Sequence, residues 1–96
     1  MPRLDAVYSL IKKKFNAVGL NPDRYTLGDD YQDDSYALYS DGKYWYIGTN
    51  DRGKAHEEAR FNSPASAAEH LIFILLKGTQ KVTFPDIDWT EYASLP

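Results

Sequence analysis

The sequence of 96 residues contains no cysteine, which excludes disulfide bonds, thiolate metal sites and thiol catalysis. Its two histidines, His56 and His70, have no companions at ligand spacing, so we predict no metal site and no cofactor. No glycine-rich phosphate-binding motif is present. The longest apolar run, Leu71 to Leu76, is far shorter than the roughly 20 residues needed to span a bilayer.

The chain also lacks a basic excess. Its formal net charge of −3 argues against nucleic acid and anionic membranes as partners, because both require a basic surface. The start, MPRLDAV, lacks the apolar stretch of a signal peptide, and we therefore expect a cytoplasmic protein. The length predicts one domain over residues 1–96, and the hydrophobic fraction of 43% is typical of a folded globule.

The most informative stretch is the aromatic segment from Ser35 to Asn50, which predicts a β-hairpin. Two runs rich in tyrosine flank Asp41-Gly42, and Asp-Gly favours a two-residue type I′ turn. That turn would pair Ser40 with Lys43, Tyr39 with Tyr44, Leu38 with Trp45, Ala37 with Tyr46 and Tyr36 with Ile47. Because side chains alternate along a strand, the hairpin would have one apolar face and one tyrosine-rich face.

We assign the more apolar face to the core and the other to an outer, solvated surface. The predicted core face carries Tyr36, Leu38, Trp45 and Ile47, and the predicted outer face carries Ala37, Tyr39, Tyr44 and Tyr46. Tyrosine supplies a large contact area at a small entropy cost, so Tyr39, Tyr44 and Tyr46 are candidate binding residues. Ordinary cross-strand pairing on a solvated face explains the same row without any ligand.

Elements on both sides complete the predicted fold. Apolar spacing predicts a helix over Arg3–Val18 that ends at Gly19, and a second helix that begins after Ser63 and runs to about Lys77. Short strands are predicted at Arg24–Leu27, Lys54–Phe61 and Lys81–Phe84, and Trp89 and Tyr92 are expected to anchor the C-terminal segment. The result is an α+β domain in which two helices cover one face of an antiparallel meander of three or four strands.

An acidic loop precedes the hairpin. Asp29, Asp30, Asp33 and Asp34 lie within six positions, and aspartate is unfavourable inside helices and strands, so we predict a surface loop. With Tyr31, these residues are candidates for contact with a basic partner. Solubility is the alternative explanation, and the loop lacks the ligand register of a calcium-binding EF-hand.

No pair of residues in the sequence predicts catalysis. His56, Glu57 and Glu58 are adjacent on a predicted strand, so their side chains alternate between faces and cannot converge on one atom. We therefore predict that the protein is not an enzyme. A binding function remains, and a second predicted surface, formed by Phe73 and Ile74 off the core stripe of the second helix, allows a homodimer.

Residues 36–78 resemble small immunity proteins of bacterial polymorphic toxins, including those of contact-dependent growth inhibition systems. The resemblance rests on the aromatic hairpin YALYSDGKYWYIG, the turn Asp51-Arg52-Gly53, the strand that ends at Phe61, and the alanine-rich helix opened by Asn62-Ser63-Pro64. It implies a protein that binds a cognate toxin C-terminal domain and blocks its active site or substrate surface. Many such toxins are nucleases with basic clefts.

On this interpretation the acidic loop would imitate the phosphate backbone of a nuclease substrate, and the tyrosine face would extend the contact. Two alternatives remain open. One is a small binding module that uses the outer sheet face for a peptide or small molecule. The other is a homodimeric structural subunit.

Overall fold

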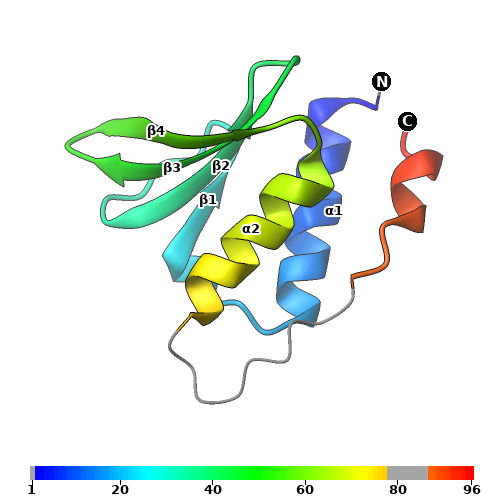
Figure 1. Ribbon diagram of the computed structural model, residues 1–96, viewed down its shortest axis with the longest axis horizontal. Helices are drawn as coiled ribbons and strands as arrows, with labels where there is room; N and C mark the ends of the chain where they lie inside the picture. The colour runs from blue at the N-terminus through cyan, green and yellow to red at the C-terminus, as the bar shows by residue number, and fades with distance from the viewer. Residues whose placement is uncertain (1, 78–86) are drawn as a thin grey trace.

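The computed structural model describes residues 2–77 and 87–96, and it is an α+β fold of one four-stranded sheet and two helices (Figure 1). The helices are α1 (Leu4–Ala17) and α2 (Pro64–Leu76), and the strands are β1 (Tyr25–Leu27), β2 (Ser35–Ser40), β3 (Trp45–Asp51) and β4 (Lys54–Phe61). Two short 3-10 helices are η1 (Pro22–Arg24) and η2 (Thr90–Ser94). Both α-helices lie on the same side of the sheet, as predicted (Figure 1). The predicted strand Lys81–Phe84 lies outside the described residues.

The helix ends form where their capping residues predict. At the end of α1, the N–H of Leu20 donates to the carbonyl of Phe15 (3.0 Å) and that of Gly19 to Asn16 (3.1 Å). These two bonds form a Schellman motif, which needs the left-handed backbone that Gly19 adopts at φ 80°. At the start of α2, the Ser63 hydroxyl accepts from the N–H of Ser66 (3.1 Å).

The sheet is mixed, which corrects the predicted antiparallel meander. Its strand order is β1-β2-β3-β4, and the β2–β3 and β3–β4 pairs are antiparallel, but β1 runs parallel to β2. A parallel pair needs a return connection, and residues 28–34 supply it. Because β1 has only three residues and spans about 10 Å, seven residues are enough to return to the start of β2.

The hairpin register also differs from the prediction. Ser40 pairs with Trp45, Tyr39 with Tyr46 and Leu38 with Ile47, so the β2–β3 loop contains four residues, not two. The type I′ prediction was wrong because that turn needs positive φ at both central residues, and among the described non-glycine residues only Asp34 and Arg52 have it. The register moved by two residues, and every strand residue therefore keeps its predicted face. Tyr44, however, lies in the loop and not in a strand.

A β-bulge interrupts the β3–β4 ladder. Ile47 pairs with Ala59 and Gly48 with Glu57, leaving Glu58 as the extra residue. The predicted strict alternation along Lys54–Phe61 is therefore broken at this point. A Cβ atom at Gly48 would lie 2.4 Å from the His56 carbonyl oxygen, so the bulge brings the two backbones closer than a side chain allows.

The core lies between the helices and the inner face of the sheet. Leu38, Trp45 and Ile47 from the sheet are buried, as predicted, and Tyr36 packs against them partly exposed. The helices contribute buried side chains at Val7, Leu10, Ile11, Phe15, Ala67, Ala68, Leu71 and Ile72. Edge-to-face contacts join Tyr8 to Trp45 (5.5 Å between ring centroids) and Phe15 to Tyr25 (4.9 Å).

The C-terminal segment packs on α1 and α2, beside the N-terminus (Figure 1). Trp89 and Tyr92 are half-buried against the core, which confirms them as anchors. The Trp89 indole N–H donates to Glu69 (3.2 Å), and Glu91 bridges Lys13 (2.9 Å) and Lys14 (2.8 Å). Two of the three consecutive lysines of α1 therefore form ion pairs with this segment.

Candidate functional site

The acidic loop, residues 28–34, connects β1 to β2 and presents all four predicted aspartates as exposed residues. Hydrogen bonds fix its second half. The N–H of Asp34 donates to the Asn50 carbonyl (3.0 Å), the Gln32 amide donates to the carbonyl of Asp23 (3.1 Å), and the Ser35 hydroxyl donates to the carbonyl of Gln32. Asp34 adopts a left-handed φ of 62°, which aspartate tolerates better than most residues.

Tyr31 joins the acidic loop to the turn between β3 and β4. Its hydroxyl accepts from the N–H of Gly53 (2.7 Å) and donates to the carboxylate of Asp33. Partial desolvation and the bond to Asp33 raise the pKa of Tyr31, so the phenol stays protonated and keeps this donor at neutral pH. Tyr31 as a whole is 43% exposed, so it can contact a partner while it holds the loop.

Beneath the acidic loop, Asn50 forms a buried polar hub at 2% exposure. Its amide nitrogen donates to the hydroxyls of Thr26 (2.9 Å) and Ser35 (2.9 Å), and so links three strands. Asn50 Oδ1 is buried without a hydrogen-bond partner among the described residues. The loop is bonded to Asn50 and so lies beside this polar hub, and Ala37, which was predicted on the solvated face, is buried.

The predicted tyrosine row is present in part. Tyr39 and Tyr46 are cross-strand partners on the outer face and stack with ring centroids 5.3 Å apart at 24°. Tyr44 does not continue their row. It lies in the β2–β3 loop, where the Arg60 guanidinium (4.8 Å) and the Lys43 ammonium (5.2 Å) approach its ring.

Asp41 organises this loop. Its carboxylate accepts from the N–H groups of Lys43 and Tyr44 (both 2.8 Å) and from the Tyr46 hydroxyl (2.6 Å). The N–H of Tyr44, then the Tyr46 hydroxyl, then the N–H of Lys43 lower the pKa of Asp41 to about 2. The same bonds explain the four-residue loop, because they satisfy backbone donors that a two-residue turn would place elsewhere.

We expect the Asp41 carboxylate to titrate near pH 2 in an NMR titration of the side-chain carboxyl carbon. Replacing Tyr46 with phenylalanine removes one donor and should raise this pKa. Since the folded pKa lies below the usual value of 3.8, Asp41 stabilises the fold above pH 4, and this contribution disappears as the pH falls from about 4 to 2. A midpoint near 4 in the wild type would contradict the three hydrogen bonds.

The second half of the acidic loop shares the outer face with the predicted tyrosines but lies at a different end of it, whereas Asp30 lies at the β1 edge beside Lys12 of α1. Tyr31, Asp33 and Asp34 lie beside the β3–β4 turn, through the bonds to Gly53 and Asn50. Tyr39, Tyr44 and Tyr46 lie toward the β2–β3 loop, where Arg60 and Lys43 add positive charge. The Asp41 carboxylate, which accepts from the Tyr46 hydroxyl, adds negative charge at that end as well.

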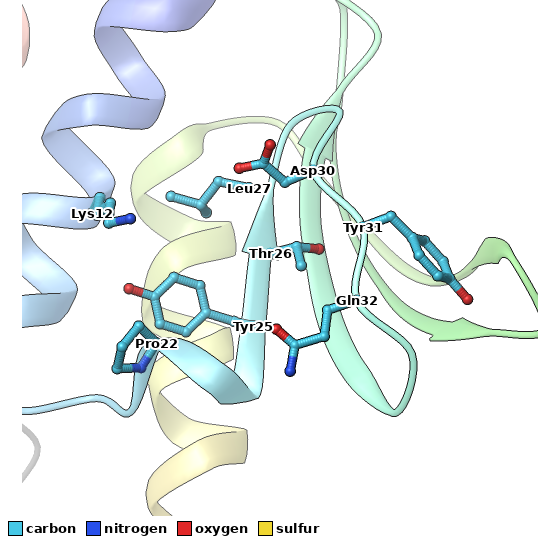
Figure 2. Close-up of a pocket in the computed structure, with 8 residues that line it drawn as sticks. All are labelled: Lys12, Pro22, Tyr25, Thr26, Leu27, Asp30, Tyr31 and Gln32. Atoms are coloured by element: carbon cyan, nitrogen blue, oxygen red, sulfur yellow. The ribbon is translucent and has the colours of Figure 1, made fainter.

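A pocket that the sequence did not predict lies between α1, β1 and the acidic loop (Figure 2). It has a volume of about 280 Å³ and is lined by Lys12, Pro22, Tyr25, Thr26, Leu27, Asp30, Tyr31 and Gln32. A second hollow of about 270 Å³ adjoins it and shares Lys12, Leu27 and Asp30. The pocket follows from the parallel return of the chain past β1, which no local sequence signal indicates.

Within residues 2–77 and 87–96, no cluster of histidine, aspartate and glutamate side chains is arranged to hold a metal ion. No helix in this part of the chain is both long and apolar enough to cross a membrane. Phe73 on α2 is 47% exposed, whereas Ile74 is half-buried against the core. Comparison with protein-family models, curated proteins and solved structures gave no match.

Proposed function

We propose that this protein is an immunity protein that binds a cognate toxin C-terminal domain in the cytoplasm and neutralises it by occlusion. The partner's surface is basic, as in a nuclease cleft, and the acidic loop enters it. This mechanism needs no catalytic group, because binding alone prevents access of substrate to the toxin. The supporting observations are the conformation and charge of residues 28–34.

The observation that carries the proposal is a fixed loop whose charges are not neutralised. In the described part of the chain, Asp29, Asp30, Asp33 and Asp34 form no ion pair with lysine or arginine. The loop is nevertheless held by Tyr31, by Ser35 and by Asn50. Ordering it on association therefore costs little, and its carboxylates are available to a cationic partner.

The stacked pair Tyr39 and Tyr46 supports the same proposal, since both rings lie on the outer face that the second half of the acidic loop shares. Their arrangement is held by the strand pairing and by the bond from Tyr46 to Asp41. Rigid aromatic side chains are common at the energetic centres of protein interfaces. We expect the loop to determine the association rate and the tyrosine pair to contribute to the lifetime of the complex.

The test is co-expression and purification with the C-terminal domain of the protein encoded immediately upstream. The proposal expects that this domain is toxic alone, and that the chain rescues growth and co-purifies with it. Replacing Asp29, Asp30, Asp33 and Asp34 with asparagine should slow association at low salt by about tenfold or more, as expected when electrostatic steering is lost. Stopped-flow mixing measures the association rate, and calorimetry measures the affinity of the complex.

A matched control variant removes the same number of negative charges from outside the acidic loop. Asp5, Glu69, Asp88 and Glu91 lie on α1, α2 and the C-terminal segment, and replacing them with the corresponding amides should leave association nearly unchanged. Equal association rates for the two quadruple variants would contradict the proposed role of the acidic loop. Absence of both toxicity and a complex would contradict the immunity function and favour the small binding module.

A further inference from the structure

The pocket between α1, β1 and the acidic loop contains three polar groups that the fold does not use. Lys12 and Asp30 are exposed, and neither side chain forms an ion pair in the described part of the chain. Tyr25 is only 5% exposed, yet its hydroxyl has no hydrogen-bond partner among the described residues. An unpartnered buried hydroxyl is unfavourable, so a ligand that accepts this bond recovers free energy.

These three groups lie on two sides of the pocket. In Figure 2, the Tyr25 ring extends from β1 toward α1, and its hydroxyl lies on the same side of the strand as Lys12. Asp30 projects from the acidic loop, with Leu27 between it and Lys12 in this view. The pocket therefore presents a cation and a hydroxyl donor on one side and a carboxylate on the other.

The charges restrict the class of ligand. A simple anion would be repelled by Asp30, and a simple cation by Lys12, whereas a zwitterion satisfies both. Burial raises the pKa of Tyr25, which keeps its hydroxyl a donor at neutral pH. Pro22, Leu27 and the Tyr25 ring add apolar lining, which suits a side chain without charge.

We propose that this pocket binds a free α-amino acid with an apolar side chain. The ligand carboxylate contacts the Lys12 ammonium and accepts from the Tyr25 hydroxyl, and the ligand ammonium contacts Asp30. The site does not depend on the immunity function, and its test requires no toxin. Because Asp30 also belongs to the acidic loop, an occupied pocket would neutralise one of the four loop carboxylates.

The experiment is calorimetric titration of the purified chain with L-leucine, alongside two derivatives that each lack one charge. Leucinamide removes the carboxylate and N-acetyl-leucine removes the ammonium. We expect one leucine per chain, and affinity at least about tenfold lower for each derivative, as for loss of a charge-assisted hydrogen bond. Absence of leucine binding at millimolar concentration, or equal affinity for leucinamide, would overturn the proposal.

Variants of the chain then locate the site. Lys12→Ala, Asp30→Asn and Tyr25→Phe should each weaken leucine binding by about tenfold, whereas Lys13→Ala and Asp33→Asn, which are adjacent but do not line the pocket, should not. Tyr25→Phe is the most informative variant, because it removes an oxygen without a partner and should not lower the unfolding midpoint. Unchanged leucine affinity in Lys12→Ala or Tyr25→Phe would exclude this binding mode.

Discussion

Replacing Gly48 with alanine is expected to destabilise the domain by about 2–4 kcal/mol, which corresponds to a fall in Tm of about 10–25 °C. The added Cβ would lie 2.4 Å from the carbonyl oxygen of His56 and 3.0 Å from its carbonyl carbon. Both are backbone atoms of β4, so no side chain can rotate to make room. The strands must separate at the bulge, and thermal or urea unfolding measures the loss.

Gly53→Ala is the matched control. Gly53 lies in the adjacent β3–β4 turn with a φ of 82°, and nothing lies within 4 Å of a Cβ built there. Alanine at this position suffers only the backbone cost of the left-handed conformation, about 1–2 kcal/mol. If Gly48→Ala proves milder than Gly53→Ala, the close approach of β3 and β4 at the bulge is not present in solution.

Replacing Asn50 with aspartate should have the second large effect, a loss of about 3–5 kcal/mol at pH 7. The substitution puts a carboxylate at a position that is 2% exposed. It also removes the amide that donates to Thr26 and Ser35, whose own hydroxyl protons point to the carbonyls of Tyr36 and Gln32. The carboxylate would face oxygen lone pairs with no donor to compensate its charge.

This variant should also acquire a characteristic pH dependence. Burial raises the pKa of the new carboxyl in the folded state above its unfolded value of about 3.9, so the folded state binds more protons between the two values. Stability of Asn50→Asp should therefore fall as the pH rises from 4 to 7, and be partly restored by acid. Asn62→Asp, an exposed position with the same charge change, is the control and should not show this fall. Equal urea midpoints for the two variants at pH 7 would show that Asn50 is not buried in solution.

Local signals predicted the helices well because their determinants lie close together in the sequence. Gly19 and Leu20 end α1 through bonds to residues three and five positions earlier, respectively, and Ser63 caps α2 through a residue three positions later. The core face of the hairpin was equally predictable from the sequence. The alternation of Leu38, Trp45 and Ile47 survives any register change of two residues.

The errors arise where side chains compete with simple backbone rules. Asp41-Gly42 favours a tight turn by propensity, but the Asp41 carboxylate binds two backbone N–H groups and the Tyr46 hydroxyl, and these bonds stabilise a longer loop. Tyr44 therefore lies in this loop and not in the predicted row of tyrosines. The direction of β1 was not predictable either, because parallel neighbours normally require a connection of a dozen residues or more.

The sequence predicted the residues of the candidate site as two separate groups. It did not predict the contacts and the pocket that surround them. The exposure of the four aspartates follows from their composition alone. Nothing in the sequence relates Tyr31 to Gly53, which meet through the return of the chain past β1, or Lys12 to Tyr25, which meet because α1 lies beside β1. The pocket is a property of topology and not of any motif.

The sheet order described above also bears on how the chain folds. Each strand pairs with the strand that precedes or follows it in the sequence, and the longest connection between paired strands has only seven residues. Closing loops of this length costs little entropy, so the sheet can assemble from short-range contacts. Contacts between α1 and the C-terminal η2 join opposite ends of the chain and carry the largest closure cost. We therefore expect the C-terminal segment to dock late, after the sheet that presents the acidic loop has formed.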